Sequence, residues 1–263
     1  MPNLKRVNEL PPKTDSKDHP TLRKIEMETN VVPPYLIMLF SEEMVLCTGC
    51  IVMPDLVIST ASCLDVQVNR NDEKFLAVKI TSSFTEYLKE RLKKPFEESV
   101  NMTNVEERRS LEYYLHPQYL ARVQDIDLVL IKLNHPFDIK ENELPKMSYG
   151  KTKELRNCTT LYFALNSTKD ETKLTLKTRE NFMVSLWHFL AVPSMYCFDL
   201  GQTKSTTHLC PGVSGSPLIR FNELWGIASF SFPICDCNEI YFYCFIDFFA
   251  AQKWLKTYIK VKQ

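Results

Sequence analysis

Short apolar runs separated by turn-forming residues recur along most of the chain, for example at residues 35–40, 51–60, 128–133 and 224–230. Runs of this length, bounded by turn signals, are typical of β-strands, and many in succession indicate an all-β sandwich or barrel. With 263 residues, 44% of them hydrophobic, the chain can bury one large core,. The pattern therefore predicts a single globular unit of the all-β class.

Two polar segments interrupt or precede this pattern. Residues 1–30 carry many charges, Pro11-Pro12 and few large apolar groups. Such a composition cannot offset the entropy of ordering, so we expect a flexible extension. Residues 84–104 are highly charged and the neighbouring 105–114 are similarly polar. We interpret 84–114 as a solvated surface insertion, irregular or helical.

The end of the chain has helical periodicity. Phe248, Ala251, Leu255 and Tyr258 follow one another at intervals of three and four, and lysines come late in this stretch. Apolar residues at this spacing with cations near the C-terminal end predict an amphipathic helix over 247–260.

The charge balance and hydropathy exclude some classes of partner. The 32 basic and 32 acidic residues cancel, which removes the electrostatic footprint of a nucleic-acid-binding protein,. No run of about 18 apolar residues occurs, so we expect no transmembrane segment. The first residues have no apolar stretch of the signal-peptide kind, which leaves the cytoplasm open. Nine cysteines and the sequons at Asn101, Asn157 and Asn166 instead favour the secretory pathway, with a secreted or vesicular glycoprotein,.

Three segments together point to one family. Residues 47–63 read Cys-Thr-Gly-Cys-Ile-Val-Met-Pro-Asp-Leu-Val-Ile-Ser-Thr-Ala-Ser-Cys, residues 127–133 read Asp-Leu-Val-Leu-Ile-Lys-Leu after His-Pro-Gln-Tyr at 116–119, and residues 210–218 read Cys-Pro-Gly-Val-Ser-Gly-Ser-Pro-Leu. The chain resembles trypsin-like serine proteases over residues 34–258. The resemblance places Asp127 at the triad aspartate, Ser214 at the nucleophile, and the amides of Gly212 and Ser214 at the oxyanion hole. The residue at the catalytic histidine is Ser62.

The resemblance implies a fold and a set of disulfides. The fold is two antiparallel six-stranded barrels of the chymotrypsin type, one over about 34–145 and one over about 146–246, with the C-terminal helix packed on the second. The implied disulfides are Cys47–Cys63 and Cys210–Cys235. A Cys158–Cys197 bridge is conceivable, and the pairing of Cys50, Cys237 and Cys244 stays open. Zinc at the closely spaced cysteines is a weaker alternative, and we expect no metal or cofactor.

Several matched positions depart from an active protease. Ser62 cannot serve as the base that a serine nucleophile needs. Val213 stands where the family has the acid that receives the new N-terminus after activation. His208 stands at the base of the specificity pocket, and Ser229 and Ser231 also belong to the altered pocket and activation positions. The pocket is therefore expected to have lost its usual selectivity.

These departures predict an inactive protease homologue that binds another protein and uses no cofactor. Membership of a larger assembly is open, with residues 1–30 and 84–114 as docking elements. Inactive relatives of trypsin occur in the reproductive tract and sperm, so the acrosome is a setting suggested by analogy. The alternative is a weak or atypical serine hydrolase in which another base activates Ser214.

Overall fold

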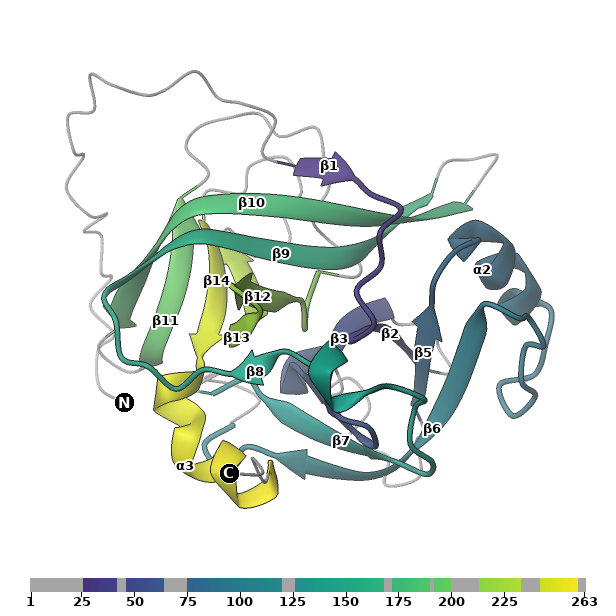
Figure 1. The fold of residues 1–263 in the computed structure, drawn as a ribbon, viewed down its shortest axis with the longest axis horizontal. Helices are drawn as coiled ribbons and strands as arrows, with labels where there is room; N and C mark the ends of the chain where they lie inside the picture. Colours follow the sequence, from purple (N-terminus) through teal and green to yellow (C-terminus); the bar gives the residue numbers. More distant parts are fainter. Residues whose placement is uncertain are drawn as a thin grey trace, which may run out of the picture.

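The computed structural model describes residues 26–41, 46–63, 75–119, 126–167, 172–189, 192–199, 213–232 and 242–259. Two β-barrels stand side by side, with short helices at their margins (Figure 1). The all-β prediction is confirmed.

The first barrel is a closed ring of six antiparallel strands. Three of the apolar runs in the sequence supply its strands, and Ile37, Ile58 and Leu130 are fully buried in it. In ring order the strands are β2 (Leu36–Phe40), β3 (Leu46–Met53), β4 (Leu56–Ser59), β7 (Val129–Leu133), β6 (Val105–Leu115) and β5 (Leu76–Ile80).

The second barrel closes because β9 pairs with both β12 and β10. Its ring order is β10 (Thr172–Phe189), β11 (Val192–Asp199), β14 (Phe242–Asp247), β13 (Glu223–Phe232), β12 (Pro217–Arg220) and β9 (Glu154–Ser167). Two short strands extend this sheet. β8 (Lys146–Met147), which follows the 3₁₀ turn η1 (Glu141–Glu143), runs parallel to β13, and β1 (Glu26–Glu28) pairs with β10.

The strand β1 corrects the boundary of the predicted N-terminal extension. Glu28 lies opposite Lys177 of β10, and Thr29 N–H donates to the carbonyl of Leu176 at 3.1 Å. Backbone hydrogen bonds to an open sheet edge order a polar segment without apolar burial. The prediction of a flexible segment over 1–30 therefore extended too far, while residues 1–25 lie outside the described part of the chain.

The charged region 84–114 is more ordered than predicted. Residues 84–92 form the helix α2 (Phe84–Leu92), and residues 105–115 are β6, a strand of the first barrel. The interpretation of 105–114 as solvated surface was therefore wrong. Charges on β6 hide its strand character, but they are paired in the fold, for example Glu106 with Lys79 at 2.8 Å.

A buried arginine anchors the turn after α2. Arg91 is 3% exposed, and its guanidinium donates to the carbonyls of Glu98, Lys94 and Pro95. It also lies 3.6 Å from the carboxylate of Glu107 on β6. The guanidinium fork thus satisfies several carbonyls at once and holds the turn against the barrel.

The C-terminal helix α3 (Phe248–Tyr258) begins where its cap predicts, since the Asp247 side chain accepts from Phe249 N–H at 2.9 Å,. Its aromatic side chains contact the first barrel. Tyr258 stacks on Tyr114 at 4.5 Å between ring centroids, and Trp254 meets His116 edge-on at 5.0 Å. The helix also contacts β14, and Lys151 lies over the Phe249 ring, so it packs on the second barrel as expected and on the first barrel as well.

Two disulfides are present in the described residues. Cys47–Cys63 is the bridge that the family resemblance implies. The second joins Cys197 to Cys244, which lie directly opposite each other on β11 and β14 with Cα atoms 4.2 Å apart. A Cys158–Cys197 bridge is therefore wrong, and Cys158, like Cys50, is a buried free thiol. Cys210, Cys235 and Cys237 lie outside the described residues.

None of the helices in the described ranges is long and apolar enough to cross a membrane.

Candidate functional site

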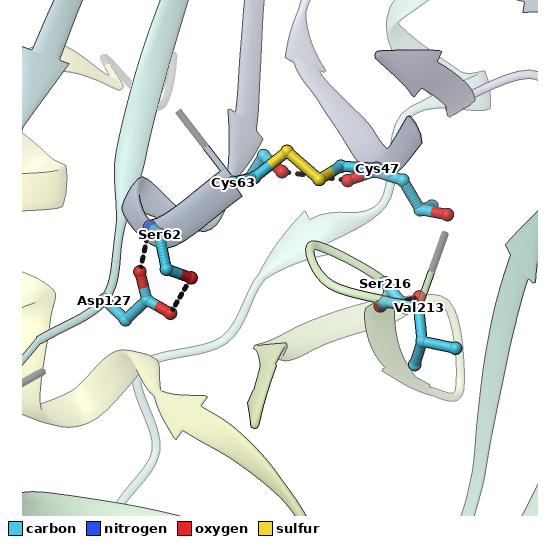
Figure 2. The surroundings of a disulfide bond; sticks show 8 residues. Cys47, Ser62, Cys63, Asp127, Val213 and Ser216 are labelled. Atoms are coloured by element: carbon cyan, nitrogen blue, oxygen red, sulfur yellow. Dashed lines mark hydrogen bonds between the residues drawn. A yellow bond between two sulfur atoms is a disulfide. The ribbon is translucent and has the colours of Figure 1, made fainter. Parts of the chain in front are cut away.

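Ser62 and Asp127 are in direct contact at the seam between the barrels. Ser62 lies on a single helical turn that follows β4, next to the Cys47–Cys63 disulfide, and Asp127 lies just before β7. The N–H of Ser62 donates to Oδ1 of Asp127 at 2.6 Å, and its hydroxyl donates to Oδ2 at 2.7 Å. Figure 2 shows the Ser62 side chain turned toward this carboxylate.

A third residue completes this contact from the second barrel. The hydroxyl of Ser229, on β13, donates to Oδ2 of Asp127 at 2.6 Å, and both residues are buried. Burial raises the pKa of the Asp127 carboxyl above its usual range, although hydrogen bonds from Ser229, Ser62 and Ala61 favour the charged form,. The matched segment grouped Ser229 with the altered pocket positions, and no signal in the sequence indicated its contact with Asp127.

Ser214 lies in a tight turn just before β12 of the second barrel. Its carbonyl accepts from Thr48 N–H of β3 at 2.9 Å, so the turn is held to the first barrel through its backbone. The Ser214 side chain is half-buried, and no hydrogen bond joins it to Ser62 or Asp127 in the described structure. Among the described side chains, none of the histidines is hydrogen-bonded to Ser214.

The next residue, Gly215, cannot be replaced without strain. Its φ is +85°, and a Cβ there would lie 1.9 Å from the carbonyl oxygen of Thr48 and 2.2 Å from Ser59 Oγ. Its N–H donates to the carbonyl of Ala228 at 2.9 Å. Backbone contacts on both sides therefore require glycine at this position.

Val213 is buried in an apolar cluster of the second barrel. Its side chain is 3% exposed, and the hydroxyl of Ser216 donates to its carbonyl. Figure 2 shows Val213 and Ser216 on one turn, separate from the Ser62–Asp127 contact. The other members of the cluster are Leu155, Cys158, Tyr162, Ala164, Tyr196, Leu218, Trp225, Ala228 and Phe245. These apolar side chains suit valine, and a carboxylate at this position would be buried among them,.

Neither of the two histidines whose side chains are described contacts the Ser62–Asp127 pair. Nδ1 of His116 accepts from Gln118 N–H at 3.2 Å, its ring packs on Trp254, and burial lowers its pKa. His135 lines a pocket at another part of the first barrel, with Arg109 and Asn134. The side chains of His19, His188 and His208 lie outside the described structure.

The family follows from a comparison of the whole sequence. A family model described as Trypsin matches residues 25–255. The chain belongs to the trypsin family. No curated protein sequence matches it significantly.

The structure describes only some of the remaining site residues predicted for this trypsin-family chain. Gly212, His208 and the Cys210–Cys235 pair lie outside the described residues, and Ser231 is described only through its backbone in β13. Asn101 and Asn157 are solvent-exposed, and Asn166 is placed in β9 by its backbone alone. Among the described residues, no three His, Cys, Asp or Glu side chains are placed to share a metal ion.

The described geometry therefore consists of a buried acid that accepts hydrogen bonds from Ser62, Ser229 and Ala61, and of a separate serine turn. Hydroxyls can donate to the Asp127 carboxylate, but they do not accept a proton usefully near neutral pH. Proton transfer away from Ser214 would need a group that is absent from the described side chains around Asp127.

Proposed function

We propose that this trypsin-family protein binds other proteins and does not hydrolyse them. The observation that carries the proposal is the pair of hydrogen bonds from Ser62 to Asp127, at 2.6 and 2.7 Å. In the family, a histidine at this position links the aspartate to the nucleophile. Here the Ser62 side chain hydrogen-bonds to the aspartate and does not connect it to Ser214.

The chemical consequence is the loss of general-base catalysis. A serine hydroxyl becomes nucleophilic when a neighbouring base takes its proton, and removing a triad member costs about 10⁴ to 10⁶ in turnover. The remaining backbone donors of the oxyanion hole can stabilise a transition state only after attack begins. Binding without turnover is the function that such a scaffold retains.

The surroundings of Val213 support the same proposal. A carboxylate at this position would pair with the N-terminal amine that activation cleavage releases in the family. Valine in an apolar cluster offers that amine no counter-charge. Cleavage before the domain would then not order the oxyanion hole.

We further propose that the protein matures in the secretory pathway. Disulfides persist in oxidising compartments, and both Cys47–Cys63 and Cys197–Cys244 are formed,. The exposed Asn101 and Asn157 are accessible for glycosylation. Its partner in that compartment would be another protein, and the acrosome is one setting consistent with inactive relatives.

Labelling with a fluorophosphonate probe tests the absence of catalysis. Purified wild type, a Ser214→Ala variant and an active trypsin are incubated with the probe, and labelling is followed by fluorescence in gels. We expect wild type to remain as dark as Ser214→Ala while trypsin labels. Labelling of wild type that disappears in Ser214→Ala would establish an atypical hydrolase and overturn the proposal.

A further inference from the structure

The loop between β12 and β13 carries an unusual residue. Arg220 pairs with Glu223, so Phe221 and Asn222 form a two-residue hairpin loop. Both have positive φ, 49° for Phe221 and 60° for Asn222. Such turns favour asparagine and glycine, whereas a bulky aromatic residue at positive φ is strained. Strain of this kind is retained where the side chain has another use.

The Phe221 side chain is exposed yet held in place. It is 76% exposed, and the Arg220 guanidinium lies 5.0 Å from its ring centroid. The same guanidinium lies 5.9 Å from the ring centroid of the buried Trp225, and Arg220 Nε donates to the carbonyl of Arg156 at 3.2 Å. A phenylalanine side chain has only two rotatable bonds and loses little entropy on binding, which suits an interface anchor.

The charges around Phe221 indicate the chemistry of a partner. In the described structure, no carboxylate bonds to the Arg220 guanidinium, whose contacts are the two rings and one carbonyl. Arg156 has a side chain that is 70% exposed, and its contact with the exposed Glu154 is a weak 3.4 Å pair,. Lys146, whose N–H donates to the carbonyl of Asn222, is also exposed. Cations here outnumber the carboxylates of Glu154 and Glu223.

We infer that the β12–β13 hairpin tip is a protein-docking surface. Phe221 inserts into an apolar pocket of the partner, and carboxylates at the rim of that pocket pair with Arg220 and Arg156. The inference rests on the proposed binding function and locates the binding surface at this hairpin tip. The strand β12 separates this tip from the Ser214 turn, so the proposed surface is not the residual protease site itself.

A library of random peptides displayed on phage provides the probe. Phage are selected on immobilised wild-type protein, and the recovered peptides are synthesised for fluorescence anisotropy. Binding is measured for wild type, Phe221→Asn, Arg220→Gln and Leu111→Asn. The last replaces a 62% exposed residue on β6 and is the matched control. Thermal unfolding of each variant is recorded in parallel.

We expect recovered peptides to contain a large apolar residue flanked by Asp or Glu. Phe221→Asn should weaken their binding about 30-fold or more, Arg220→Gln should weaken it less, and Leu111→Asn should leave it unchanged. Because asparagine tolerates positive φ, Phe221→Asn should also raise the melting temperature. Binders that are insensitive to Phe221→Asn, recovery of no binder, or a lower melting temperature together with lost binding would overturn the inference. These results leave the fluorophosphonate test untouched, so the two proposals fail separately.

Discussion

The N–H and the hydroxyl of Ser62 both donate to the Asp127 carboxylate, one to each oxygen. With the Ser229 hydroxyl, they form a closed polar cluster across the two barrels. All of these groups hydrogen-bond to the aspartate, and none of them hydrogen-bonds to Ser214 in the described structure. The cluster is therefore a structural unit, and burial and hydrogen bonding predict how substitutions in it change the stability of the fold.

Replacing Asp127 with asparagine should raise stability at neutral pH. The amide oxygen can still accept from the Ser62 N–H, and the amide nitrogen can donate to the Ser62 and Ser229 hydroxyls. Because burial raises the folded pKa, the contribution of Asp127 to stability is greatest below the unfolded value, about 3.9, and is lost as pH rises through the folded pKa,. Thermal unfolding between pH 4 and 7 should show the advantage of Asp127→Asn growing with pH. The exposed Asp138→Asn is the control, and a destabilised Asp127→Asn at pH 7 would contradict this account.

Introducing the acid that the family has at position 213 should damage the fold. Val213→Asp places a charge among apolar side chains with no cation in the described cluster, at a cost of about 3–5 kcal/mol,. Urea unfolding measures the loss, with the isosteric but uncharged Val213→Thr as control. The penalty of aspartate should shrink at low pH, where its carboxyl is protonated. Equal stability of Val213→Asp and wild type at pH 7 would reveal an unseen counter-charge.

Gly215→Ala should destabilise the protein by about 3 kcal/mol, since its Cβ would collide with the backbone of Thr48 and its φ is positive,. Gly150→Ala offers a comparison, because a Cβ there would meet side-chain atoms and no backbone, the nearest in the ring of Trp225 at 3.1 Å. The unfolding midpoints of both variants in urea provide the measurement. If the two substitutions cost the same, the close approach of the turn to β3 is not what the fold depends on.

Arg91→Met should loosen the segment that follows α2. The change leaves several carbonyls without a donor and Glu107 buried without its cation, at about 3 kcal/mol,. Hydrogen exchange of residues 93–100 should accelerate more than that of the barrel strands. Lys93→Met removes an exposed cation from the same turn and should change little. Uniform acceleration across the first barrel would instead assign Arg91 to the core.

Much of the fold follows from local sequence patterns. The runs at 35–40 and 128–133 are apolar because their strands are buried on both faces, so hydropathy alone finds them,. Hydropathy alone does not find the strand β6. Its charges are matched by partners on neighbouring elements, as in Glu106 with Lys79, and such pairing depends on contacts that are distant in sequence. The strand β1 is missed for a related reason, because its partner β10 is distant in sequence.

In the candidate site, too, local sequence identifies some features, and others depend on contacts that are distant in sequence. Ser62, Asp127 and Ser214 are identified by the segments around them, whereas the contact of Ser229 with Asp127 joins residues 102 positions apart. The Cys197–Cys244 bridge was missed because nine cysteines allow many pairings, and only the register of β11 against β14 selects this one,.

The Ser214 turn has a consequence for recognising enzymes by motif. Thr48 N–H donates to the backbone carbonyl of Ser214, and the space beside Gly215 excludes any side chain, so the architecture demands glycine at position 215 whether or not a bond is ever cut. A search for the Ser-Gly motif at 214–215 would therefore group this chain with active proteases. The more informative position for proposing activity or its loss is 62, where serine hydrogen-bonds to the buried Asp127.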